Sequence, residues 1–264
     1  MKMTNKNNLF DIKGKVAVIT GGLGKLGTEY AKTLVNHGAK VVIIDVVSIK
    51  DDHELFPYVQ KDMVLALRAD ITKIKDLESA LSVIEKKWDT PNILINNAAI
   101  DFPPSGGGDT FETYPLEKLQ KVLDVNLTGT IICCQIFGGA MAKAKNGSII
   151  NIYSTYGIVS PDQRIYTNFI KPVSYSVTKS GILNLTRYLA TYWATSNVRV
   201  NTLSPGGVFN NQPKDFVERY NDRTPLGRMA NADEYNGAIL FLSSDASRYM
   251  TGANLVIDGG WTAW

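Results

Sequence analysis

The chain has 264 residues, of which 44% are hydrophobic and 20% charged, and its 28 basic and 25 acidic residues leave a formal charge of +3. This composition is typical of a globular protein whose core is large enough to need no disulfides. The small net charge argues against nucleic acid or a membrane as a partner. Residues 1–8 are polar and no apolar run follows them, so we expect a flexible N-terminus over 1–9, no secretory signal and a cytoplasmic location.

Strand-like and helix-like segments alternate along the chain. Short apolar runs predict seven strands, over 15–20, 40–45, 64–68, 92–96, 148–153, 198–202 and 254–257. Helical periodicity predicts one helix that ends near residue 37 and others over 75–88, 116–143, 175–195 and 232–242. The alternation predicts a single α/β domain over 10–264, with a Rossmann fold: a doubly wound parallel sheet of about seven strands, covered by helices on both faces.

Three long loops, over 101–114, 155–174 and 206–224, all follow predicted strands. We expect them to gather at the carboxyl edge of the sheet, where such folds bind ligands. The two cysteines, Cys133 and Cys134, are adjacent on a predicted helix and are expected to be small buried hydrophobes in a reducing compartment. No histidine has ligand spacing to them, so no metal site is predicted. The apolar run over 130–141 is too short to span a bilayer.

A glycine-rich turn, Thr-Gly-Gly-Leu-Gly-Lys-Leu-Gly over 20–27, joins the first strand to the first helix. Glycines let the backbone approach a pyrophosphate, and a helix N-terminus offers unpaired N–H groups. Asp45 follows Gly27 by 18 residues, at the end of the second strand, where a carboxylate can bind an adenosine ribose. Its charge would repel a 2′-phosphate, which favours NAD over NADP. The alternative is a structural turn with a solvated aspartate.

Tyr175 and Lys179 are four residues apart, which on a helix places them on one face. A cation beside a phenol favours phenolate, so the tyrosine can exchange a proton near neutral pH. The spacing alone is not specific, because Tyr114 and Lys118 share it. The context differs, since Tyr175 opens a long helical segment and follows a strand that ends at Ser154.

These motifs, in this order, resemble the classical short-chain dehydrogenase/reductase family from about residue 10 to residue 264. The glycine motif of that family, Thr-Gly-x-x-x-Gly-x-Gly, maps onto 20–27, with Lys25 in place of the middle glycine. The resemblance implies four catalytic residues, Asn126, Ser154, Tyr175 and Lys179. It implies cofactor contacts from Gly21, Gly24, Lys25, Leu26, Gly27, Asp45, Asp70, Ile71, Asn97, Ala98, Ala99, Tyr175, Lys179, Pro205, Gly206, Val208 and Asn210.

The roles of the four catalytic residues come from the same resemblance. Ser154 would hydrogen-bond the substrate oxygen, and Tyr175 would act as the general acid in reduction and the base in oxidation. Lys179 would lower the pKa of Tyr175 and hold the nicotinamide ribose, while Asn126 would anchor a water that relays protons. Lys25 would either lean over the cofactor or be a solvated lysine, and this leaves NADP as the less favoured cofactor.

The segment that joins Ser154 to Tyr175 is longer than is usual in the family, with the two residues 21 positions apart. We expect it to bulge over the mouth of the site, with Tyr156, Arg164 and Gly207 as substrate contacts. Its hydroxyl, amide and cationic groups suit a polyhydroxylated or phosphorylated ligand. The alternative is an exposed loop whose charges face water. This loop also resembles a subgroup of flagellin-modification or surface-glycan oxidoreductases.

The resemblance therefore implies an NAD-dependent oxidoreductase that interconverts a secondary alcohol and a ketone, with a sugar or sugar derivative in glycan biosynthesis as the candidate substrate. One alternative is a catalytically silent sensor or scaffold of the same fold, and another is an epimerase or dehydratase that uses NAD transiently. The family usually assembles through the helices predicted over 116–143 and 175–195, so we expect a homotetramer or homodimer.

Overall fold

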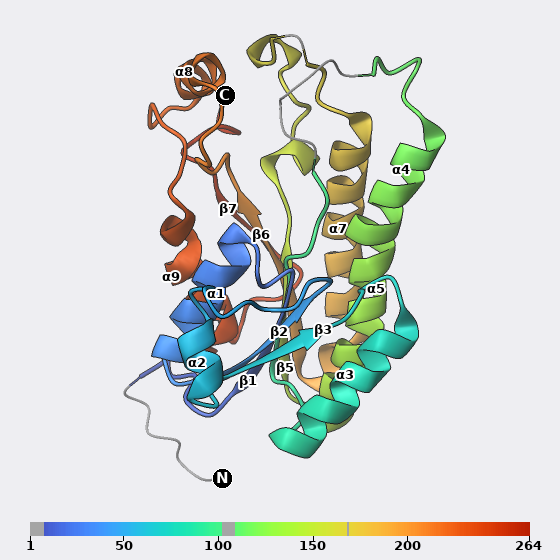
Figure 1. Ribbon diagram of the computed structural model, residues 1–264, viewed down its shortest axis with the longest axis vertical. Helices are drawn as coiled ribbons and strands as arrows, with labels where there is room; N and C mark the ends of the chain where they lie inside the picture. The colour runs from blue at the N-terminus through green and yellow to red at the C-terminus, as the bar shows by residue number, and fades with distance from the viewer. Residues whose placement is uncertain (1–7, 102–108, 168) are drawn as a thin grey trace.

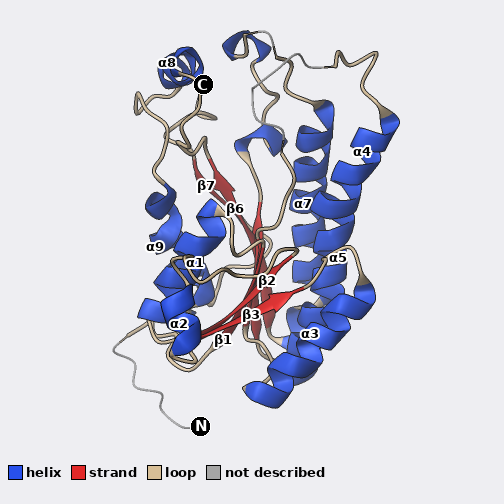
Figure 2. Cartoon of the chain, viewed as in Figure 1, coloured by secondary structure: helices blue, strands red, loops and turns tan. Residues whose placement is uncertain are grey.

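The chain forms one seven-stranded sheet in the computed structural model, which describes residues 8–101, 109–167 and 169–264 (Figures 1 and 2). The strands are β1 (Val16–Thr20), β2 (Lys40–Asp45), β3 (Val64–Arg68), β4 (Ile93–Asn96), β5 (Gly147–Ile152), β6 (Val198–Pro205) and β7 (Asn254–Ile257). Their order is β3-β2-β1-β4-β5-β6-β7, and every neighbouring pair is parallel. The predicted fold class is confirmed.

Helices cover both faces of the sheet (Figure 1). One face carries α1 (Lys25–Asn36), α2 (Phe56–Gln60) and α9 (Asn236–Ser243). The other carries α3 (Ile74–Lys87), α4 (Leu116–Leu123), α5 (Thr130–Cys133), α6 (Gly139–Ala144) and α7 (Val173–Tyr192). The remaining helix, α8 (Lys214–Arg223), lies beyond the carboxyl edge of the sheet, beside the C-terminus.

The core has two layers because successive side chains of a strand point to opposite faces. In β1, Ala17 and Ile19 pack in the layer under α1 and α9, whereas Val16 and Val18 pack in the layer on the opposite face. β2 alternates in the same way. Burial on both faces is the reason that the strands read as continuous apolar runs.

The helix predicted over 116–143 is helical from Leu116 to Ala144 but contains two π-helical segments, η1 (Asp124–Gly129) and η2 (Cys134–Gly138). By length and composition alone, these 29 residues could cross a membrane, because an 18-residue window within them has a mean hydropathy of 1.4. This helix is longer than the apolar run over 130–141, which is too short on its own to span a bilayer. The most apolar stretch is half buried within the protein, where Cys133 and Phe137 pack on the sheet, and core helices of soluble proteins pass the same test.

Within the described residues, two α-helices were not predicted. α8 lies inside the segment 206–224 that the sequence predicted as a loop, and its N-terminal neighbour is Pro213, which cannot donate a backbone hydrogen bond. Phe216 and Tyr220, four residues apart, bury one face of it. The other unpredicted helix is the five-residue α2. The expected flexible segment 1–9 falls outside the described residues except for its end, where the Leu9 carbonyl accepts a hydrogen bond from Ala246 N at 2.9 Å.

The strand order reverses between β1 and β4, and the chain crosses to opposite sides of the sheet there. In open α/β sheets, the crevice outside the carboxyl ends of strands at such a point is where ligands bind. The ends of β1, β4, β5 and β6 therefore define where a functional site is expected.

Candidate active site

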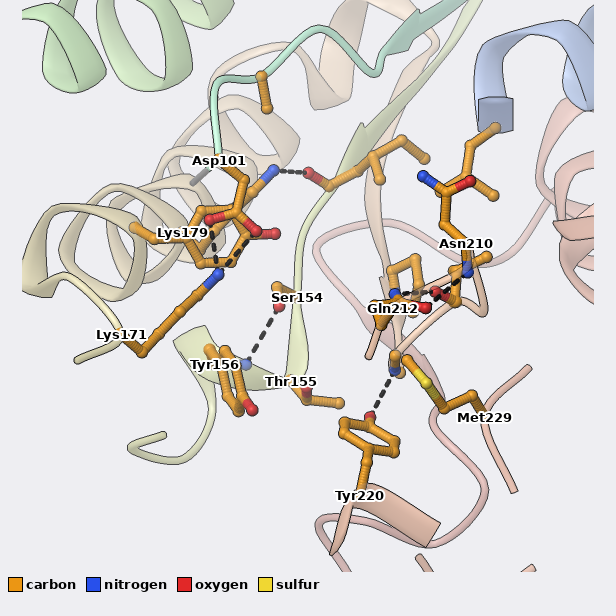
Figure 3. Close-up of a pocket in the computed structure, with 18 of the residues that line it drawn as sticks. Asp101, Ser154, Thr155, Tyr156, Lys171, Lys179, Asn210, Gln212, Tyr220 and Met229 are labelled. Atoms are coloured by element: carbon orange, nitrogen blue, oxygen red, sulfur yellow. Dashed lines mark hydrogen bonds and ion pairs between the residues drawn. The ribbon is translucent and has the colours of Figure 1, made fainter. Parts of the chain in front are cut away.

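A cavity of about 610 Å³ opens at the carboxyl ends of β4, β5 and β6 (Figure 3). Its lining contains these predicted site residues: Ser154, Tyr175, Lys179, Leu26, Asn97, Ala99, Pro205, Gly206, Val208, Asn210, Tyr156 and Gly207. In Figure 3, Ser154 and Lys179 lie across the cavity from Asn210 and Gln212. Folding thus brings together motifs that are as far apart in the sequence as residues 26 and 210.

Ser154, Tyr175 and Lys179 meet where β5 ends beside α7. Lys179 is buried, and its Nζ donates a 2.8 Å hydrogen bond to the carbonyl of Ile152 while lying 5.7 Å from the centre of the Tyr175 ring. The Ser154 hydroxyl accepts a 3.2 Å bond from Tyr156 N and also hydrogen-bonds Tyr175. The phenol therefore has a hydroxyl partner and a neighbouring ammonium.

Burial dominates the ionisation of this group. It raises the pKa of Tyr175 above its ordinary value, Asp101 raises it further, and the hydrogen bond to Ser154 opposes both. Burial also lowers the pKa of Lys179 to about 8, against the opposing charge of Asp101. The sequence predicted that Lys179 would lower the Tyr175 pKa. In the structure, desolvation outweighs any such effect, and the phenol stays protonated at neutral pH.

Asn126 is buried within η1 and does not line the cavity. Its side-chain oxygen accepts a 2.7 Å bond from Ile100 N, and its amide nitrogen donates a 2.9 Å bond to Ile100 O. This pairing fixes the backbone that comes after β4, immediately before Asp101. The expected role in a water relay stays a prediction.

The glycine turn packs too closely to accept side chains. Gly21 has φ +60°, and a Cβ added at Gly27 would lie 2.5 Å from Gly21 O. The Asn97 amide donates to the carbonyls of Thr20 and Gly21 at 3.1 and 3.0 Å, which holds the turn against β4. α1 begins at Lys25 with no side-chain cap from any described residue, so its first N–H groups are available to an anion. These features fit a dinucleotide pyrophosphate.

Lys25 is exposed, yet its ammonium is not free. Its Nζ donates a 2.5 Å bond to the carbonyl of Phe209 and a 3.2 Å bond to the side chain of Asn210. Lys25 therefore joins the start of α1 to the segment after β6, across the mouth of the expected cofactor cleft. The sequence left two possibilities open for Lys25, a contact with the cofactor or a solvated side chain. This contact within the protein is a third arrangement.

We predict that Lys25→Ala weakens NADH binding by about three- to tenfold, because a hydrogen bond at an exposed position contributes about 0.5–1.5 kcal/mol. Loss of the contact frees the segment around Asn210, so backbone amide exchange there should speed up as well. Fluorescence titration and hydrogen exchange measure the two effects. Lys50→Ala, an exposed lysine after β2, is the control. Unchanged exchange near Asn210 would contradict the proposed link.

The remaining cofactor candidates lie along the ends of β2, β3 and β4, next to the turn. Asp45 accepts a 3.2 Å bond from Leu23 N in the turn, and Ala98 N donates to the Thr20 hydroxyl at 3.1 Å. Partial burial raises the pKa of Asp70, but hydrogen bonds from Thr72 outweigh it and hold that pKa below its ordinary value.

Ile71 directs its side chain inward. It is 6% exposed, and a Cβ added at Gly129 of η1 would lie 2.7 Å from Ile71 Cδ1. Only the backbone of Ile71 is therefore available for a cofactor contact. Its side chain instead holds the long helix close to the end of β3.

Sequence reasoning missed part of the cavity wall. Asp101 lines it and pairs with Lys171, and three further residues close the far side: Phe216, Tyr220 and Met229. Tyr166 and Lys171 belong to the long loop that was expected over the mouth of the site, and both line the cavity. The spacing of Phe216 and Tyr220 is a helical signal that could have indicated α8. Arg164, a predicted substrate contact, does not line the cavity. Its side chain is 82% exposed and forms an ion pair with Asp162 at 2.8 Å.

Fold and cavity together define a nucleotide-dependent oxidoreductase of the Rossmann type. A family model described as enoyl-(acyl carrier protein) reductase matches residues 24–262. The chain belongs to the short-chain dehydrogenase/reductase family, as the sequence predicted, and it is an oxidoreductase.

Individual relatives align over nearly the whole chain. An NAD-dependent glycerol dehydrogenase of Listeria innocua is 32% identical, covering 96% of both chains. Post-translational flagellin modification protein A of Campylobacter coli is 30% identical, covering 95% of this chain and 99% of that protein. The crystal structure of a short-chain dehydrogenase from Leptospira borgpetersenii with bound NAD+ is 35% identical, with a TM-score of 0.85, and covers 99% of this chain and 98% of that one.

Proposed function

We propose that the chain is an NAD-dependent dehydrogenase that interconverts a secondary alcohol and a ketone, with Tyr175 as the general acid and base and a polyol or sugar as substrate. The observation that carries this is the meeting of Ser154, Tyr175 and Lys179 in one cavity beside the uncapped N-terminus of α1. The NAD-dependent glycerol dehydrogenase and the NAD+-bound relative support the cofactor and the substrate class.

Bound NAD supplies the hydride acceptor. The chain orients and deprotonates the alcohol: Ser154 donates a hydrogen bond to the substrate oxygen, and Tyr175 takes the hydroxyl proton in oxidation or returns it in reduction. Lys179 and Asn97 would hold the nicotinamide ribose, and the turn around Gly24 would hold the pyrophosphate. Asp45 would bind the adenosine ribose. An intact catalytic set is the reason to prefer an enzyme to a silent sensor.

The cofactor assignment predicts that NADH binds at least about tenfold more tightly than NADPH, because a carboxylate a few ångströms from a 2′-phosphate costs on the order of 1 kcal/mol or more. Asp45→Ser should remove most of that preference. Asp51→Ser deletes the same charge at an exposed position nearby and should keep it. Separate fluorescence titrations with each cofactor measure this. Preference for NADPH in the wild type would overturn the role of Asp45, and binding of neither would favour a different function.

We further propose that the protein is a cytoplasmic homotetramer or homodimer. Exposed apolar residues on α4 and α7 support association, among them Leu116, Val177, Tyr188 and Tyr192, which are 50–76% exposed. A partner chain would remove that apolar surface from water. Light scattering of the purified protein measures the mass directly.

A further inference from the structure

Asp101 and Lys171 form an ion pair in the cavity wall that the catalytic roles leave unused. Lys171 Nζ lies 2.6 and 2.7 Å from the two carboxylate oxygens (Figure 3). The Lys171 side chain is 6% exposed, whereas that of Asp101 is 44% exposed. The ammonium is thus buried against its partner, whereas the carboxylate is partly exposed and lines the cavity.

The pair lies beside the reacting phenol. Lys171 Nζ is 4.6 Å from the centre of the Tyr175 ring, closer than the 5.7 Å of Lys179. Asn126 fixes the backbone of Ile100, the residue before Asp101, through two hydrogen bonds. A buried asparagine therefore positions the carboxylate, next to the place where a substrate alcohol would meet Tyr175.

The charges of the cavity are nearly all matched. Among the described lining residues, the carboxylates and cations are Asp101, Lys171 and Lys179. Lys171 is neutralised by Asp101, and Lys179 is bound to a backbone carbonyl and serves the reaction itself. Arg164, the other cation of the long loop, is paired with Asp162 outside the cavity. Among the described lining residues, an anionic substrate would find Asp101 beside the reacting alcohol and, apart from Lys179, no cation without a carboxylate partner.

We propose that Asp101 and Lys171 form a subsite for the hydroxyl group next to the reacting alcohol, so that the enzyme selects neutral vicinal diols and rejects hydroxy acids and sugar phosphates. A carboxylate accepts and an ammonium donates, which matches the two hydrogen-bonding functions of a hydroxyl group. A substrate carboxylate would be repelled by Asp101. This inference rests on the proposed function, and it narrows the polyhydroxylated or phosphorylated ligand expected from the sequence to an uncharged one.

Three substrates with one carbon skeleton test the subsite: 2-propanol, glycerol and hydroxymalonate, whose secondary alcohols are flanked by two methyl, two hydroxymethyl and two carboxylate groups, each oxidised with NAD. In the wild type, kcat/KM for glycerol should exceed that for 2-propanol about tenfold, the value of a charge-assisted hydrogen bond. It should exceed that for hydroxymalonate on the order of 100-fold, because a like-charge contact with Asp101 is costly.

Asp101→Asn uncovers the Lys171 charge, so it should raise the hydroxymalonate-to-glycerol ratio of kcat/KM by about tenfold or more. Asp162→Asn is the matched control, because it removes the same charge from the long loop outside the cavity, and its ratios should equal those of the wild type. NADH binding verifies that each variant is folded. If Asp101→Asn does not fold, Lys171→Met replaces it. This variant should lower the same ratio, because it leaves Asp101 without its cation.

Several results would overturn the subsite. Equal use of hydroxymalonate and glycerol by the wild type would do so, as would an Asp101→Asn variant that loses activity on all three substrates in proportion. Oxidation of 2-propanol in preference to glycerol would leave a working dehydrogenase without the proposed subsite. Failure of the wild type to oxidise any of the three would count against both the proposed function and the subsite.

Discussion

Tyr175→Phe should lower kcat for alcohol oxidation by about 10³-fold, since a positioned general acid or base contributes roughly 10²- to 10⁴-fold. The hydroxyl that hydrogen-bonds Ser154 is lost, while the ring that lines the cavity remains. NADH affinity should therefore change little. Steady-state kinetics with a saturating polyol, together with an NADH titration, separate the two effects.

The pH profile provides a second measurement on the same pair of proteins. Burial raises the pKa of Tyr175, so the phenolate that acts as base is scarce at neutral pH and grows as the pH rises. Oxidation by the wild type should speed up on the alkaline side, and the remaining activity of Tyr175→Phe should lack that rise.

Tyr114→Phe is the matched control for this substitution. Tyr114 also precedes a lysine by four residues, but its hydroxyl lies 2.8 Å from that of Ser174 and does not line the main cavity. Loss of the Tyr114 hydroxyl should lower the free energy of unfolding only slightly and leave kcat within about twofold. Both effects are those expected for a single neutral hydrogen bond away from the reacting atoms. A loss equal to that of Tyr175→Phe would contradict the assignment of the base.

Gly27→Ala should weaken NADH binding by about 100-fold or more, because small-to-large changes in a packed site cost about 1–3 kcal/mol or more and here distort the phosphate turn itself. The new Cβ would lie 2.5 Å from Gly21 O and 2.6 Å from Gly22 Cα, both backbone atoms that no rotamer change can move. The unfolding midpoint should fall as well.

Gly139→Ala tests whether any glycine-to-alanine change in a helix has this effect. Gly139 begins α6, and an added Cβ there meets no heavy atom of the described chain within 4 Å. Alanine is the better helix former, so this variant should be neutral or more stable by up to about 1 kcal/mol. NADH binding of Gly27→Ala at the wild-type level would show that the turn is not the phosphate site.

The order of the strands and the outline of the site could be predicted because both depend on local patterns. Continuous apolar runs identified the seven strands, and parallel connections then left few ways to arrange them. The glycine turn, Ser154 and Pro205 lie at the carboxyl ends of β1, β5 and β6. Because parallel strands end at the same edge of a sheet, all three were expected there. The family resemblance supplied their roles.

Contacts between segments without local motifs could not be predicted from the sequence. Nothing near Lys171 indicates that it would pair with Asp101, 70 residues earlier. Lys25 likewise finds its acceptors 184 and 185 residues later. Ionisation could not be inferred from spacing for a related reason, since the pKa of Tyr175 depends on how much solvent the assembled cavity excludes.

The π-helical segment η1 makes the number of residues in this helix a constraint on the site. A π turn accommodates about one residue more than the α-helical turns around it. Deleting a single residue between Asp124 and Gly129 would let this turn become α-helical, so the helix on either side would keep roughly its present orientation while the residues within η1 would shift. Asn126 could then no longer meet Ile100. A length change of one residue should be less tolerated here than most substitutions, although the helix would remain a helix.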